Sequence, residues 1–328
     1  MRVSVIVPVH DGAVYLADCL PALHGALGSD GELIVVDDAS RDDSATIAER
    51  NRAHVVRLPR NVGAGAARNA GARLATGEVL VFVDADVVVA PDALARLVAV
   101  LEQEPGVAAV FGSYDDAPRA PGLVSQYRNL LHHFVHQHGG GAASTFWAGC
   151  GAVRRAAFMA LGGFDERVHG IEDIELGYRL RAAGHAIRLD PRIRGTHLKR
   201  WTLASVVRTD ALMRALPWSR LLVAGRAPLD HLNVGASQRA SVAATLVGAA
   251  ALPFALAVPR LALVPLAALA LVMLVNHRLL AFFARARGMA FALGTVPLLA
   301  VYYLESGLCY AWAWLEHRVR RCPGRRVP

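Results

Sequence analysis

Acidic side chains follow short apolar segments, or open a helical one, at three places in the chain, and this placement is the first sign of chemistry. They are Asp37 with Asp38, Asp84 with Asp86, and Glu172 with Asp173. Two carboxylates one residue apart can hold a hard divalent cation, which neutralises a bound diphosphate. We therefore expect Asp84 and Asp86 to bind Mn²⁺ or Mg²⁺, with Asp84 also lying beside a nucleotide.

The other two acidic pairs suit different tasks. Asp37 or Asp38, at the end of a strand, can accept a hydrogen bond from a uracil imide or a ribose hydroxyl; a turn with a helix cap is the competing interpretation. Asp173 can take the proton of an attacking hydroxyl group, with Glu172 beside it in the same catalytic pair. An acidic helix start without a catalytic role is the alternative.

Basic side chains complete the candidate site. Arg68 lies in the glycine-containing segment 61–71, which fits a dinucleotide fingerprint poorly because it does not follow the first strand. We expect Arg68 to face a base or a phosphate. His197 could add a ligand to the metal, with Lys199 or Arg200 on the diphosphate. A structural histidine is the alternative for His197.

Strands and helices in alternation must position these residues. Runs rich in β-branched residues predict buried strands over Val3–Val9, Leu33–Val36 and Val79–Val83. The intervening apolar spacing predicts helices over 15–27, 44–51 and 65–76. This alternation is typical of parallel βαβ units, which bind ligands beyond the carboxyl ends of their strands.

The pattern weakens beyond Gly112. We expect loop and acceptor-side structure there, with the histidines at 132, 133, 136 and 138 on a polar helix or loop face. A helix is predicted over Ile171–Ala183, because its first turn is acidic and Gly184 follows its end.

The order of these motifs resembles the family 2 glycosyltransferases with a GT-A fold. The motifs are Val-Pro-Val-His-Asp-Gly from Val7, Val-Asp-Asp-Ala-Ser from Val36, Asp-Ala-Asp from Asp84, Gly-Gly-Phe-Asp-Glu from Gly162 and Glu-Asp-Ile-Glu-Leu from Glu172. The resemblance covers roughly residues 1 to 200. It implies an α/β, Rossmann-like domain, a nucleotide-sugar donor, a divalent metal and inversion at the anomeric carbon.

The same resemblance assigns roles to individual residues. It places Pro8, His10, Asp38 and Arg68 in the nucleotide site, Asp84 and Asp86 in the metal motif, and Asp173 as the catalytic base. Trp147 and Gly149, in the stretch Trp-Ala-Gly-Cys-Gly, are expected on the acceptor or diphosphate side. The Gln-x-x-Arg-Trp motif of processive members is not seen, which argues against polymer synthesis.

Apolar residues concentrate after Ser241. Val242–Val258 and Leu261–Val275 carry no charge, and a third apolar stretch runs from Met289 past Glu305 to Trp314. Because about 20 apolar residues are needed to cross a bilayer, the first two predict either two short spans or one bent hairpin. Residues 277–287 resemble an interfacial helix. A buried core of a soluble domain is disfavoured, because these segments lack polar faces.

Charge and cysteine usage indicate the surroundings. The 35 Lys and Arg exceed the 27 Asp and Glu, and anionic lipid explains basic residues beside apolar segments better than nucleic acid does. The four cysteines show no pairing pattern, which favours a reducing compartment. No signal-peptide pattern precedes Val3. We expect a protein of the inner membrane with its catalytic domain in the cytoplasm.

Together these patterns predict a GT-A domain over 1–225, a juxtamembrane linker over 226–240, membrane or interfacial helices over 241–316 and a basic tail over 317–328. The predicted reaction moves a sugar, with UDP as the expected nucleotide and GDP as the alternative, to a lipid or lipid-linked hydroxyl. Competing interpretations are a polyprenyl-phosphate glycosyl synthase, a non-catalytic sugar-nucleotide-binding membrane protein and a nucleotidyltransferase. The number and orientation of the spans stay open.

Overall fold

The computed structural model describes residues 1–28, 31–227 and 235–321. It divides into two compact units. Unit 1 comprises Met1–Pro121 and His132–Arg200, and unit 2 comprises Gly122–Leu131 and the part of the chain from Trp201 onward. The predicted linker and basic tail fall partly outside the described residues, at 228–234 and 322–328. All candidate site residues belong to unit 1.

Unit 1 is built on one mixed sheet. Its main strand order is β3-β2-β1-β4-β8-β6-β9-β5, and β7 pairs with β9. The strands are β1 (Val3–Val9), β2 (Glu32–Asp37), β3 (His54–Arg57), β4 (Val79–Val83), β5 (Val87–Val89), β6 (Val107–Tyr114), β7 (Gly141–Ala143), β8 (Cys150–Arg154) and β9 (Ala186–His197). The first four strands of this order are parallel, whereas β8 runs antiparallel to both β4 and β6.

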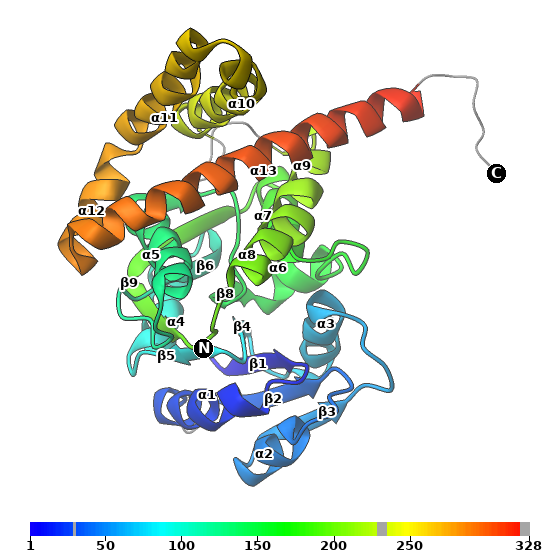
Figure 1. Ribbon diagram of the computed structural model, residues 1–328. Helices are drawn as coiled ribbons and strands as arrows, with labels where there is room; N and C mark the ends of the chain where they lie inside the picture. Colours follow the sequence, from blue (N-terminus) through cyan, green and yellow to red (C-terminus); the bar gives the residue numbers. More distant parts are fainter. Residues whose placement is uncertain (29–30, 228–234, 322–328) are drawn as a thin grey trace. The chain divides into compact units, whose positions relative to one another are not determined.

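Helices cover both faces of this sheet, which explains why the central strands are continuous apolar runs. One core joins alternate residues of β1, such as Val5 and Val7, to α1 (Ala13–Ala26), α2 (Ser44–Arg50) and α4 (Ala93–Gln103). The other joins Ile6 and its neighbours to α3 (Ala64–Leu74), α6 (Arg155–Ala160) and α7 (Glu172–Ala182). In Figure 1, α1 and α3 lie on opposite faces of β1 and β2.

The predicted strands and helices of the first 85 residues are confirmed within a few residues, but the sequence interpretation beyond Gly112 was partly wrong. The region read as loop contains β8 and the helix α5 (Leu123–His138). Two of its histidines, His133 and His136, are buried rather than on a polar face. They lie 2.8 and 3.0 Å from backbone carbonyl oxygens of β6, so they satisfy buried polar groups.

Unit 2 is helical. In addition to the first residues of α5, it contains α8 (Leu203–Arg208), the π-helix η1 (Thr209–Ala215), α9 (Leu216–Val223), α10 (Ala236–Ala257), the 3₁₀ turn η2 (Pro259–Ala262), α11 (Leu263–Val275), α12 (His277–Arg287) and α13 (Met289–Arg321). Its buried polar centre is Asp210, which pairs with Arg128 at 3.0 Å and Arg214 at 2.7 Å. This pairing offsets the cost of burying the carboxylate.

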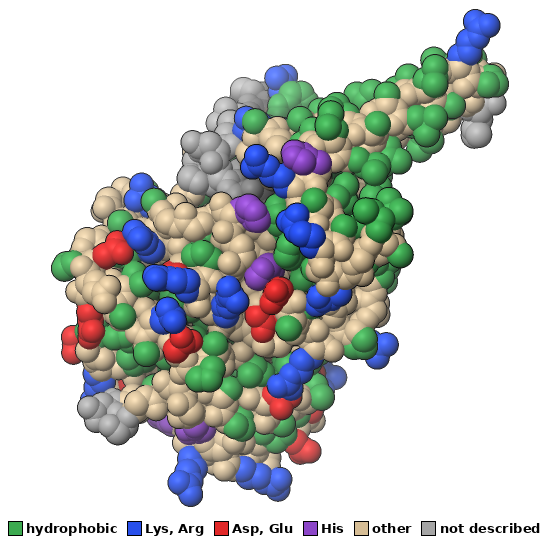
Figure 2. Space-filling model, turned by 90° about the vertical axis from the view of Figure 1, so that its left-hand side faces the viewer, with side chains coloured by type: hydrophobic (Ala, Val, Ile, Leu, Met, Phe, Trp, Pro, Cys, Tyr) green, Lys and Arg blue, Asp and Glu red, His purple; other side chains and the backbone are tan. Residues whose placement is uncertain are grey.

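Long apolar helices distinguish unit 2 from unit 1. Among the described residues, Met289–Arg320 is long and apolar enough to cross a membrane by itself. Pro259–Val275 and His277–Arg287 meet the same test only as a pair bent by 71°. Figure 2 shows hydrophobic side chains gathered along the helical hairpin of α10 and α11. On α13, Leu293, Leu308 and Trp312 are each more than half exposed, as a face packed against lipid would be.

Candidate active site

The ends of β1 and β2 hold the residues predicted to contact the nucleotide. Pro8 pairs with Val36 inside the sheet, and the Nδ1 atom of His10 lies 2.8 Å from the carbonyl oxygen of Asp38. The buried Asp37 carboxylate accepts a hydrogen bond from the backbone N–H of Ser40 at 3.0 Å. These contacts hold the turn that follows β2 against the end of β1.

Asp38 is engaged with the loop before α3. Its two carboxylate oxygens accept hydrogen bonds from the backbone N–H groups of Val62 and Gly63, at 2.8 and 2.9 Å. Gly63 has a φ of 91°, which favours glycine, and it immediately precedes α3. Asp38 therefore positions the start of the helix that carries Arg68.

Arg68 joins two of the predicted acidic groups. Its guanidinium donates to Asp84 Oδ1 at 2.6 Å and to Glu172 Oε1 at 2.7 Å. The side chains of Arg68 and Glu172 are only 6% and 8% exposed, so their ion pair is buried, whereas the Asp84 side chain is 32% exposed. Arg68 therefore joins Asp84, after the end of β4, to Glu172, at the start of α7. Removing one partner of the buried pair would leave an uncompensated charge.

Asp173 lies next to this bridge. It is half-buried, and its two oxygens accept hydrogen bonds from the N–H groups of Ala148 and Ile174, at 3.1 and 2.8 Å. Burial and the neighbouring Glu172 charge raise the pKa of Asp173 to about 7, although Arg68 and the two N–H groups oppose the shift. A carboxylate with that pKa is suited to exchange a proton near neutral pH.

Asp86 lies beside His197, the last residue of β9. Its Oδ2 lies 3.3 Å from Nε2 of His197, whose side chain is 5% exposed. Burial favours a higher pKa for Asp86, but the bond to His197 and the Lys199 charge outweigh it, so the pKa is lowered. Lys199 is half-buried and Arg200 is exposed.

Trp147 and Gly149 precede β8. A side chain on Gly149 would collide with the indole ring of Trp147, since a Cβ atom there would lie 2.4 Å from it. The Gly149 carbonyl oxygen accepts a hydrogen bond from Asp84 N–H at 3.2 Å. Trp147 is half-buried and directly precedes Ala148, which binds Asp173. The expected acceptor-side residues thus lie between the end of β4 and the start of α7.

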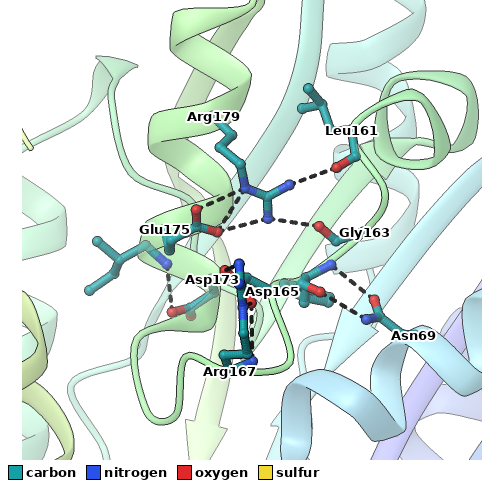
Figure 3. A network of polar contacts seen from close by, with 10 residues as sticks. Asn69, Leu161, Gly163, Asp165, Arg167, Asp173, Glu175 and Arg179 are labelled. Atoms are coloured by element: carbon teal, nitrogen blue, oxygen red, sulfur yellow. Dashed lines mark hydrogen bonds and ion pairs between the residues drawn. The ribbon is translucent and has the colours of Figure 1, made fainter. Parts of the chain in front are cut away.

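A second polar network, not anticipated from the sequence, fixes the loop that leads to Glu172 and Asp173. Arg179 bonds to Glu175 and to the carbonyl oxygens of Leu161 and Gly163, at 2.7 to 2.9 Å (Figure 3). The Asn69 side chain binds both the N–H and the carbonyl oxygen of Phe164, each at 2.9 Å. Asn69 directly follows Arg68, so one helix holds both the loop and the ion-pair bridge.

Asp86 and His197 form a donor set that fits a divalent cation. Carboxylate oxygen and imidazole nitrogen are ligands of Mn²⁺, whereas one oxygen of Asp84 is bound by Arg68. Within the described part of the chain, no group of three or more His, Cys, Asp or Glu side chains is arranged to hold a metal. A set of two protein ligands suits a cation that phosphate oxygens complete.

Substituting Arg68 with methionine is expected to lower the free energy of unfolding by about 3–5 kcal/mol, because the buried Glu172 carboxylate and Asp84 lose their shared partner. Thermal unfolding of the full chain measures this. Arg57→Met is the matched control, since its ion pair with Glu49 is more than half exposed on both sides and contributes under about 1 kcal/mol. Equal losses in the two variants would contradict a buried bridge.

The architecture of unit 1 defines a class: it is a GT-A fold, in which carboxylates lie beyond the ends of parallel strands. Comparison with known proteins agrees. Residues 4–162 match the sequence family described as glycosyl transferase family 2. Residues 4–162 therefore match the family 2 glycosyltransferases, and the resemblance predicted from the motifs is confirmed.

Solved structures support the fold. A mannosyltransferase from Pyrobaculum calidifontis, in complex with GDP-Man and Mn²⁺, is 21% identical with a TM-score of 0.57, covering 95% of this chain and 87% of that one. The S. aureus protein TarS (residues 1–349), in complex with UDP-GlcNAc, is 18% identical with a TM-score of 0.53, covering 99% and 93%. At these identities the similarity establishes the fold.

Curated relatives match over shorter stretches. An undecaprenyl-phosphate 4-deoxy-4-formamido-L-arabinose transferase of Pseudomonas savastanoi is 39% identical over 110 residues, which is 31% of this chain and 33% of that protein. Among the first curated relatives, the match spans 61% of the length of one glycosyltransferase and 33% of another.

Proposed function

We propose that this chain is a metal-dependent, inverting glycosyltransferase that moves a sugar from a nucleotide diphosphate donor to a hydroxyl group. One observation carries the proposal: Arg68 ties Asp84, after β4, to Glu172, beside Asp173, so residues 16 and 104 positions away in the sequence converge on one guanidinium. That convergence brings a phosphate-side carboxylate and a candidate base into one cluster.

Different residues of the site have different roles in the proposed reaction. Asp173 takes the proton of the acceptor hydroxyl as the oxygen attacks the anomeric carbon, and attack opposite the leaving nucleotide inverts that carbon. Asp86 and His197 would hold Mn²⁺ or Mg²⁺, which supplies charge neutralisation to the departing diphosphate. Lys199 and Arg200 follow His197 and would add positive charge there. Pro8, His10, Asp37, Asp38 and Asp84 would border the nucleotide.

The proposed acceptor is a lipid or a lipid-linked saccharide. The apolar helix Met289–Arg320 supports this, because a membrane segment keeps an enzyme beside such an acceptor. We place the chain at the inner membrane, with the catalytic domain in the cytoplasm. The domain boundaries at 225, 240 and 316 stay predictions. We expect no nucleic-acid partner.

A polyprenyl phosphate is the second candidate acceptor, and the name of the Pseudomonas savastanoi relative favours it. A phosphate is already anionic and needs no general base. The position and raised pKa of Asp173 therefore favour a hydroxyl acceptor. Identifying the linkage in the product, an ordinary glycoside or a glycosyl phosphate, separates the two.

A screen of nucleotide sugars tests the proposal. The full chain, in detergent, is incubated with UDP- and GDP-sugars with and without Mn²⁺, and thermal stabilisation and donor hydrolysis are measured; the screen is then repeated with membrane lipid extract as acceptor. We expect a UDP-sugar to stabilise the protein and to be hydrolysed only with the metal. Stabilisation without turnover would indicate a binding protein. Release of a sugar 1-phosphate, instead of a nucleoside diphosphate, would indicate a nucleotidyltransferase.

The pH dependence of transfer is a further prediction. Because Asp173 acts as a base only when it is deprotonated, kcat/KM should rise through about pH 7 and fall about tenfold per unit below it. Glu172→Gln removes the negative charge that raises this pKa, so the midpoint should move to lower pH. Glu49→Gln, an exposed change, should leave the midpoint in place. An unchanged midpoint in Glu172→Gln would contradict the assignment.

A further inference from the structure

Tyr114, at the end of β6, lies at the centre of a cluster of rings in unit 1 and has no part of its own in the proposed reaction. Its ring stacks on the His197 imidazole, with centroids 4.4 Å apart and an interplanar angle of 15°. His132 lies 4.4 Å away, and Trp147 meets the tyrosine edge-on at 4.8 Å. The tyrosine ring is thus held between three others.

The Tyr114 ring restricts the orientation of the His197 imidazole. The backbone around it is well fixed, since His197 pairs with Val87 and the Leu198 N–H binds the Asp86 carbonyl oxygen at 2.8 Å. Backbone pairing does not set the plane of an imidazole, because the terminal torsion of histidine is broad. The nearly parallel Tyr114 ring limits that torsion and leaves Nε2 facing Asp86 at 3.3 Å.

Tyr114 is itself firmly placed. It is 8% exposed, its residue pairs with Gly195 of β9, and its carbonyl oxygen lies 2.8 Å from Nδ1 of His133. Contacts from α5, from the segment before β8 and from β9 therefore restrict the same ring. A side chain held this way can orient a neighbour without moving when a ligand binds.

We propose that Tyr114 is a positioning residue, whose ring fixes the His197 imidazole so that Nε2 and the Asp86 carboxylate form a prepared pair for the donor's cation. This inference rests on the proposed function. It assigns the tyrosine ring, rather than its hydroxyl group, to the task. Support around a metal-binding histidine typically changes metal affinity by 10- to 100-fold.

The test compares Mn²⁺ binding in four forms of the full chain, measured by electron paramagnetic resonance with UDP present and, in parallel, with GDP. Tyr114→Leu should weaken Mn²⁺ binding by about 10- to 100-fold. Tyr114→Phe, which keeps the ring, should stay within about threefold of wild type. Phe111→Leu is the matched control, because Phe111 is a buried ring on the same strand that contacts His136 and Phe146.

Each outcome bears on the proposal. It is supported if Tyr114→Leu and Phe111→Leu lose similar thermal stability but only Tyr114→Leu loses Mn²⁺ affinity. It is overturned if Tyr114→Leu binds like wild type, if Tyr114→Phe is as weak as Tyr114→Leu, or if Phe111→Leu weakens binding equally. If the wild-type protein failed to bind Mn²⁺ both with UDP and with GDP, the proposed function would be contradicted, and this inference would be contradicted with it.

Discussion

The Asp173→Asn variant should transfer sugar about 10²- to 10⁴-fold more slowly than wild type while binding the donor with nearly unchanged affinity. Asparagine keeps the size of the side chain and can still accept a hydrogen bond from one of the two N–H groups, those of Ala148 and Ile174, that bind Asp173. It cannot take a proton from the acceptor. The loss should therefore appear in kcat, and initial rates at saturating donor measure it.

Two comparisons make this result specific to the base. Asp18→Asn changes an exposed carboxylate that pairs with Arg119 on the surface of unit 1, so it should transfer at the wild-type rate. Donor affinity, measured by thermal stabilisation with the nucleotide and Mn²⁺, should be alike in all three proteins. An Asp173→Asn rate within a few-fold of wild type would remove Asp173 from the base role.

The Asp86→Ala variant should lose Mn²⁺ binding and transfer together. Asp86 supplies the oxygen ligand of the proposed pair, and its carboxylate faces the buried His197 at 3.3 Å. Because a charge-stabilising group at the leaving diphosphate is typically worth 10²- to 10³-fold, we expect a loss of about that size. Titration of activity with Mn²⁺ measures both effects.

The matched change is Asp92→Ala. Asp92 pairs with Arg96 on an exposed helix turn, and its side chain is 54% exposed. Its removal should alter neither the metal dependence nor the rate. If Asp86→Ala kept the wild-type Mn²⁺ requirement and rate, the cation would have to be held elsewhere in the chain.

Local sequence patterns sufficed for the first part of the fold. β1, β2 and β4 are buried on both faces, so each is a run of apolar, mostly β-branched residues that is visible without knowing its neighbours. Acidic residues after β2 and β4 were therefore easy to place at one sheet edge. The same reasoning predicted α7, because its acidic first turn and Gly184 lie close together in sequence.

Non-local pairing explains most of what was missed. β8 contains small residues. It is a strand because it lies between β4 and β6 and pairs antiparallel with both. His133 and His136 are polar in type, but carbonyl oxygens of β6 allow them to be buried. In both cases the partners, the strands beside β8 and the carbonyl groups of β6, are distant in the sequence.

Side-chain roles show the same limit. Asp38 binds the N–H groups of Val62 and Gly63, in a loop whose path the sequence does not reveal, and its place at the nucleotide stays a prediction. The stacking of Tyr114 on His197 joins two strand ends that are 83 residues apart. The sequence around Tyr114 contains no local pattern that predicts this contact.

The most direct test of a transfer site built on Asp86, Arg68 and Asp173 is the nucleoside diphosphate released by the full chain from a nucleotide sugar with Mn²⁺ and membrane lipid extract. Wild type should release it in step with sugar incorporation into lipid, and Asp173→Asn should release at least about 10²-fold less. Equal release from wild type and Asp173→Asn, or none from wild type with any donor, would contradict the proposed function.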